Sequence, residues 1–167
     1  MRRWHKYINH QKYSECQLVT ALNAYYCLKG KVYCDQDSPC YEDLVDSCCA
    51  RVGSAIGIKK VHDKLGLTIL ERHRFLGDFI LLGKKLPLPI EVIVWHRLTG
   101  FHSVLIVDRS VKCQAVRVAN FRYETRNGWM FIDDLNLFVN RSFSGDDGIN
   151  SKGKPWNYRL FGLKEKA

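Results

Sequence analysis

The sequence predicts an α+β fold in which N-terminal helices pack on a C-terminal antiparallel β-sheet. Apolar residues recur at helical spacing through the first 65 residues, whereas residues 89–119 consist of β-branched runs separated by turns. No repeat, low-complexity tract or linker divides the chain, so we expect one domain over residues 1–167. Helices followed by strands in a chain of this length indicate two packed layers, with a cleft between them.

The first helix is predicted over residues 14–28, because apolar side chains recur every three to four residues between Leu18 and Tyr26. Gly30 is the stop signal. Ser14 is the expected N-cap, with Gln17 in the capping-box position. Cys16 would then lie in the first turn.

Further elements are predicted from the same patterns, with Gly and Pro residues marking their ends. We expect helices over residues 41–52, 56–65 and 74–83, and strands over 67–72, 89–95, 102–108, 111–119, 129–132 and 156–163. Turns at 99–100 and 109–110 would join three of these strands in an antiparallel meander. Residues 133–139 predict a short helix, and residues 140–155 a mobile polar loop.

Composition excludes some classes of protein. The 167 residues are 46% hydrophobic and 26% charged, which is ordinary for a globular protein. No apolar run reaches the roughly 18 residues that span a bilayer, and the basic N-terminus lacks the apolar stretch of a secretory signal. We therefore expect a cytoplasmic protein. The net charge of +9 is spread along the chain, which favours solubility over a nucleic-acid site, although it leaves an acidic partner or nucleic acid open.

The seven cysteines are odd in number and no export signal accompanies them, so free thiols are expected. Cys34, Cys40, Cys48 and Cys49 have spacings unlike those of zinc knuckles. We expect no metal and no cofactor.

Cys16 is the candidate nucleophile, because a helix N-terminus lowers the pKa of a thiol and a second device, an imidazolium, can come from a distant part of the chain. His102 is the best partner, since it opens an apolar strand directly after Gly100 and Phe101. His96, in a predicted turn, is the runner-up base.

A base must be oriented by a third group. Asn120 ends the strand after that of His102, and a hairpin would bring the two ends side by side. Asp108 is excluded, because six residues of strand place it roughly 20 Å from His102. Gln11, five residues before Cys16, and the Cys16 main-chain N–H are candidate oxyanion donors.

The order Gln11, Cys16, His102, Asn120 resembles the papain-like cysteine peptidase superfamily and, within it, the small C39-like peptidases. The resemblance covers roughly residues 7–138. Its motifs are Gln11-Lys-Tyr-Ser-Glu-Cys16-Gln, Leu88-Pro-Ile-Glu-Val-Ile-Val-Trp95, Gly100-Phe-His102-Ser-Val-Leu-Ile-Val-Asp108 and Val116-Arg-Val-Ala-Asn120. C39-like members usually have Asp-Cys-Gly at the nucleophile and Asp-Pro at the third position, where this chain has Glu15-Cys16-Gln17 and Asn120-Phe121.

The resemblance implies a thiol hydrolase that cleaves a peptide or isopeptide bond through an acyl-enzyme on Cys16. It implies His102 as base, Asn120 as orienter, Gln11 as oxyanion donor, and a peptide or protein substrate. Two alternatives remain: a transglutaminase-like or acyltransferase enzyme with the same Cys and His, and an inactive papain-like module that binds an acidic partner or nucleic acid.

Overall fold

The computed structural model describes residues 2–48, 55–73, 86–96, 100–121, 127–139 and 156–165. In chain order its elements are η1 (Trp4–Lys6), α1 (Cys16–Lys29), α2 (Pro39–Cys48), α3 (Ala55–Leu65), β1 (Leu67–His73), β2 (Ile90–His96), β3 (Gly100–Ser110), β4 (Ala115–Ala119), β5 (Trp129–Phe131), α5 (Ile132–Phe138) and β6 (Tyr158–Leu163). Across these ranges, no helix combines the length and the apolar character that crossing a membrane requires.

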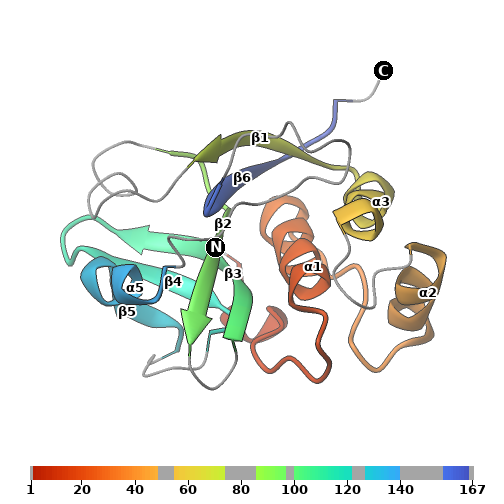
Figure 1. Ribbon diagram of the computed structural model, residues 1–167, viewed down its shortest axis with the longest axis horizontal. Coiled ribbons are helices and arrows are strands. Elements are labelled where there is room, and N and C mark those ends of the chain that lie inside the picture. The colour runs from red at the N-terminus through yellow and green to blue at the C-terminus, as the bar shows by residue number, and fades with distance from the viewer. Residues whose placement is uncertain are drawn as a thin grey trace.

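The strands form one antiparallel sheet in the order β1-β6-β2-β3-β4-β5. Strands β2, β3 and β4 are the predicted meander. Helices α1, α2 and α3 lie together at one side of the molecule, and α5 lies by β5 at the other (Figure 1). The α+β class is therefore confirmed for the described residues.

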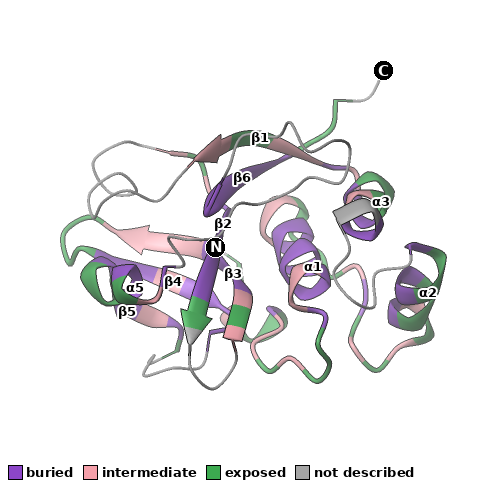
Figure 2. Cartoon of the chain, viewed as in Figure 1, coloured by how far each residue is buried: buried purple, intermediate pink, exposed green. Residues whose placement is uncertain are grey.

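Buried side chains form two hydrophobic clusters. Figure 2 shows buried residues along α1 and along the central strands. Side chains alternate between the faces of a strand. Along β3, Leu105 belongs to the cluster with α1, whereas Val104 and Ile106 belong to the cluster with α5. The two faces of the sheet are called here the α1 face and the α5 face.

Helix α1 begins at Cys16, and Glu15 is its N-cap residue, without a side-chain capping bond. The predicted N-cap at Ser14 and the capping box with Gln17 are therefore wrong. The Glu15 carboxylate instead accepts a hydrogen bond from the Tyr41 hydroxyl at 3.3 Å. The predicted stop is confirmed, because Gly30 has a left-handed backbone (φ 77°) and donates to the Tyr26 carbonyl.

Helix α2 begins at Pro39, two residues before the predicted start, because proline suits the first helical position and Ser38 Oγ accepts from the Tyr41 N–H at 3.3 Å. The predicted end of this helix, residues 49–52, lies outside the described residues. Helix α3 and strand β1 match their predictions closely. The predicted helix 74–83 and loop 140–155 also lie outside the described residues.

The turn predicted at 109–110 is wrong, because both residues still pair with β4. The chain reverses over residues 111–114, where the Gln114 N–H donates to the Val111 carbonyl at 3.2 Å and Gln114 has a φ of 50°. The apolar alternation through Val111 and Cys113 predicted a strand where the turn lies. The short strand β5 and helix α5 are confirmed within one residue, and β6 begins two residues later than predicted.

Candidate functional site

Cys16 is the first residue of α1 and is partly exposed. Burial raises the pKa of its thiol above the ordinary value, and the main-chain N–H groups of Ser103 and Gln17 act in the opposite direction. The helix start was expected to favour the thiolate, but burial outweighs it here. At neutral pH the sulfur therefore carries its proton in the resting protein.

His102 lies on β3, where its Nε2 is 2.7 Å from the main-chain oxygen of Asn120. A carbonyl oxygen only accepts, so Nε2 must carry the hydrogen of the neutral ring and Nδ1 is left as the acceptor. Burial lowers the pKa of His102, and the bond to Asn120 partly offsets this. The ring is therefore neutral at pH 7, with a basic nitrogen available.

Asn120 follows β4 in a left-handed backbone conformation, with φ at 65°. Its main-chain N–H donates to Asn9 Oδ1 at 3.2 Å, and its side-chain Nδ2 donates to Gln11 Oε1 at 2.8 Å. The sequence predicted that the Asn120 side-chain oxygen would orient His102. In the structure its main-chain oxygen makes that contact, and its side chain holds Gln11.

Gln11 uses one side-chain N–H to donate to the Tyr13 carbonyl at 2.5 Å, while its oxygen accepts from Asn120. A primary amide has two N–H groups. Among the described residues the second N–H has no hydrogen-bond partner, so the contacts of Gln11 are compatible with the predicted donor role.

These contacts connect the four predicted residues through Ser103 and Asn120, although strand alternation directs the side chains of His102 and Ser103 to opposite faces of β3. The Ser103 N–H meets the Cys16 thiol, His102 is the neighbour of Ser103, and Asn120 joins His102 to Gln11. Among the described contacts, Cys16 and His102 share no hydrogen bond. His96, the runner-up base, is the last residue of β2. It pairs with Gly100 on β3, and Gly100 precedes His102 by two residues.

A chain of buried polar groups lies beside this site on the α1 face, and sequence reasoning missed it. Glu91 on β2 accepts from Arg159 on β6 and from the Ser103 hydroxyl, which also contacts Thr20 on α1. The available signal was one charged residue inside each of two otherwise apolar strands, since such residues are seldom buried without a partner.

An exposed aromatic pair lies one register position from His102 in the sheet. Trp95 and Phe101 are register partners on β2 and β3, next to the pair Val94 and His102. Their side chains are 51% and 62% exposed. Strand alternation places them on the same face as Ser103, the residue whose N–H meets the Cys16 thiol.

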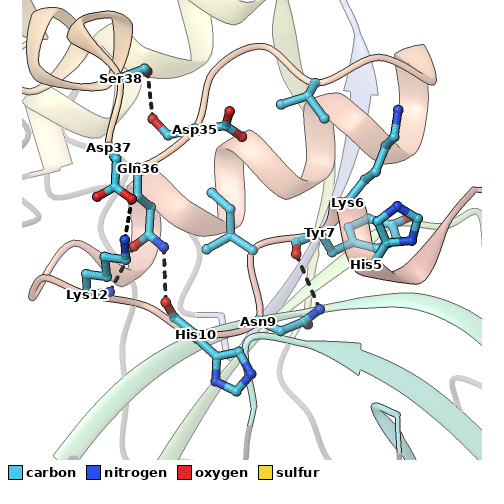
Figure 3. Close-up of a pocket in the computed structure, with 12 residues that line it drawn as sticks. His5, Lys6, Tyr7, Asn9, His10, Lys12, Asp35, Gln36, Asp37 and Ser38 are labelled. Atoms are coloured by element: carbon cyan, nitrogen blue, oxygen red, sulfur yellow. Dashed lines mark hydrogen bonds and ion pairs between the residues drawn. The ribbon is translucent and has the colours of Figure 1, made fainter.

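A hollow of about 760 Å³ lies between the N-terminal segment 5–12 and the loop 32–38 (Figure 3). Gln36 joins its walls, accepting from the Lys12 N–H at 2.9 Å and donating to the His10 carbonyl at 3.0 Å. None of Cys16, His102 and Asn120 lines this hollow. It therefore does not include these three residues, although Asn9, which lines it, accepts from the Asn120 N–H.

Within the described ranges, no cluster of three or more His, Cys, Asp or Glu side chains is arranged to hold a metal ion. The cysteines at 16, 27, 34, 40, 48 and 113 are free thiols. Comparison with known proteins finds no matching family model, no similar curated protein and no similar solved structure. Any assignment of function therefore depends on the geometry of the residues above.

Proposed function

We propose that this chain is a papain-like cysteine peptidase, with Cys16 as nucleophile and His102 as general base. The observations that support the proposal are the Ser103 N–H at the Cys16 thiol and, from the preceding residue His102, the hydrogen bonds through Asn120 to Gln11. In the proposed papain-like arrangement the substrate lies in a cleft between α1 and the sheet.

The reaction begins from a neutral thiol and a neutral imidazole. His102 Nδ1 takes the proton of Cys16 as the sulfur attacks the substrate carbonyl carbon. The tetrahedral intermediate then collapses, the C–N bond breaks, and the imidazolium gives its proton to the leaving amine. Water, deprotonated by His102, attacks the thioester and releases the acid and the thiol.

Two N–H groups are the proposed donors to the oxyanion. The Cys16 N–H is the first of α1 and has no partner within the helix. The second N–H of Gln11 is the other. Removing one such donor in other enzymes lowers kcat by about 10²- to 10³-fold.

The substrate is proposed to be a peptide with a large apolar side chain near the scissile bond. Trp95 and Phe101 expose two rings on the sheet face that carries Ser103, one register position from His102. Aromatic surface of this kind gains stability by packing against an apolar or aromatic side chain.

The test combines a peptide-library digest with labelling by an electrophilic peptide probe. We expect cleavage by the wild-type chain, covalent labelling at Cys16, and loss of both in Cys16→Ala and of cleavage in His102→Ala. Cys113→Ala, which removes an exposed thiol, is the matched control and should cleave normally.

Two results would contradict the proposal. A wild-type chain that neither cleaves peptides nor labels at Cys16 faster than at Cys27 would indicate a non-catalytic module. Incorporation of an added amine in preference to water would indicate a transferase that uses the same two residues.

A further inference from the structure

A buried ion pair joins two neighbouring strands of the sheet next to the candidate site. Glu91 on β2 is fully buried, Arg159 on β6 is 3% exposed, and the two residues are register partners. Arg159 Nε donates to Glu91 Oε1, and the guanidinium also lies 4.2 Å from the centre of the Trp156 ring. One oxygen of Glu91 is therefore committed to Arg159.

The second oxygen of Glu91 leads toward α1. Ser103 Oγ donates to Glu91 Oε2 at 2.6 Å. A serine hydroxyl has one hydrogen, so the 2.8 Å contact between Ser103 Oγ and Thr20 Oγ1 must have Thr20 as its donor. The hydrogen bonds thus run in one direction, from α1 to Glu91.

Thr20 follows Cys16 by four residues, so the two side chains lie on the same side of α1, one turn apart. Ser103 meets both: its hydroxyl contacts Thr20, and its main-chain N–H faces the Cys16 thiol. Its neighbour His102 is the proposed base. Ser103 therefore links Glu91 to the proposed nucleophile by contact, and to the proposed base through the chain.

We propose that Glu91 is a positioning residue for Cys16: through Ser103 it holds residues 102–103 against the start of α1, and it fixes a negative charge beside a sulfur that must itself become negative. This inference rests on the proposed function in taking Cys16 as the nucleophile. Glu91 does not touch the substrate; it acts through Ser103 and through its field.

The electrostatics around the thiol agree with this arrangement. After burial, the Glu91 charge is a cause that raises the pKa of Cys16. The ionisable groups that adjoin these residues are Glu15, which precedes Cys16, His102, which precedes Ser103, and Arg159, which pairs with Glu91 and lowers the pKa of His62. Glu91 thus keeps the sulfur protonated until His102 accepts the proton, which ties formation of the thiolate to the attacking step.

The experiment measures iodoacetamide alkylation of each cysteine by mass spectrometry across a pH series. Glu91→Gln keeps the shape of the side chain and removes its charge. We expect the rate–pH curve of Cys16 to move to lower pH, so that alkylation at neutral pH rises about 3- to 10-fold, which corresponds to about half to one pKa unit. Cys27 and Cys113, followed in the same sample, should keep their wild-type curves.

Thr20→Val is the matched variant, since it removes the hydroxyl that donates to Ser103 and leaves the charge of Glu91 in place. Its Cys16 curve should keep the wild-type midpoint. If Glu91→Gln does not fold because Arg159 loses its partner, Glu91→Gln with Arg159→Met removes both charges and should show the same direction of shift.

An unmoved Cys16 curve in the folded variant, or parallel shifts at all three thiols, would overturn the inference. The second pattern is what loosened packing alone would produce. The proposed function fails separately, because peptide cleavage by the wild-type chain is not used in the alkylation measurement. A shifted curve without any peptidase activity would support the role of Glu91 and refute the peptidase.

Discussion

Side chains that alternate along β2 and β3 enter two different interiors. Toward α5, residues such as Val92, Val104 and Ile106 belong to a cluster of hydrophobic side chains. Toward α1, Glu91 and Ser103 occupy the alternate positions and form hydrogen bonds. The same two strands therefore carry an apolar face and a face with charge.

The difference indicates a division of roles. An apolar interior needs only shape and volume, and it makes the sheet rigid. A polar interior requires every group to be paired, because an unpaired polar group in a low dielectric is costly. The α1 face bears that requirement at Ser103, whose main-chain N–H faces the Cys16 thiol, so the polar chain lies next to the proposed nucleophile.

Breaking the polar chain on the α1 face should have the largest effect on stability. Arg159→Met leaves the Glu91 carboxylate buried without its cation and should lower the free energy of unfolding by about 3–5 kcal/mol. Replacing both partners, Glu91→Leu with Arg159→Met, should recover most of the loss. Urea denaturation of the three chains measures this. A double variant as unstable as the single one would show that the pair is not the cause.

Truncation of a side chain on the α5 face should also destabilise the fold, but it should leave the reactivity of the Cys16 thiol unchanged. Ile106 is 1% exposed, and Ile106→Ala should cost about 2–5 kcal/mol through the cavity it leaves. The alkylation midpoint of Cys16 should stay at the wild-type pH. A shifted midpoint would mean that any loss of packing changes the thiol, and the contrast between the faces would not hold.

The contrast also explains which features the sequence predicts. Periodicity depends on apolar side chains, so α1, α3 and the meander were placed within a few residues. Individual hydrogen bonds explain the errors. The Glu15 carboxylate binds Tyr41, which is distant in sequence, and Gln114 closes a turn where the apolar alternation predicted a strand.

In the candidate site, too, the sequence shows the residue types but not the hydrogen bonds. The types of Cys16, His102, Asn120 and Gln11 and their order along the chain can be recognised in the sequence. Which atom of Asn120 meets the ring cannot be, because it depends on the left-handed backbone at that residue. The pairing of Glu91 with Arg159 also escapes the sequence, since 68 residues separate them and only the order of β6 next to β2 joins them.

His62 offers a pH test of the α1 face. It is 6% exposed, its ring packs on Phe161, and its Nε2 has no hydrogen-bond partner among the described residues. Burial, and then the charge of Arg159, lower its pKa from 6.5 to about 3. Above pH 6.5 the ring is neutral in both states. Below it only the unfolded chain binds the proton, so the free energy of unfolding should fall by about 1.4 kcal/mol per pH unit down to about pH 3.

His62→Leu removes this titration. The slope of unfolding free energy against pH should become shallower than in the wild type, with the difference confined to the interval below pH 6.5. Urea denaturation at several pH values gives both slopes. Equal slopes in the two chains would mean that His62 is protonated in the folded state, which contradicts its burial beside Arg159.

The smallest effect is expected where the α1 face meets solvent. Trp95 is half-exposed, so Trp95→Ala should change the free energy of unfolding by about 0.5 kcal/mol or less. If the ring packs on the substrate, kcat/KM for peptides with a large apolar side chain near the cleaved bond should fall by about 2- to 10-fold, because an aromatic contact is worth about 0.5–1.5 kcal/mol. Peptides with glycine at that position should be cleaved at the wild-type rate. An equal fall for both peptides would place Trp95 outside substrate recognition and leave the apolar preference without support.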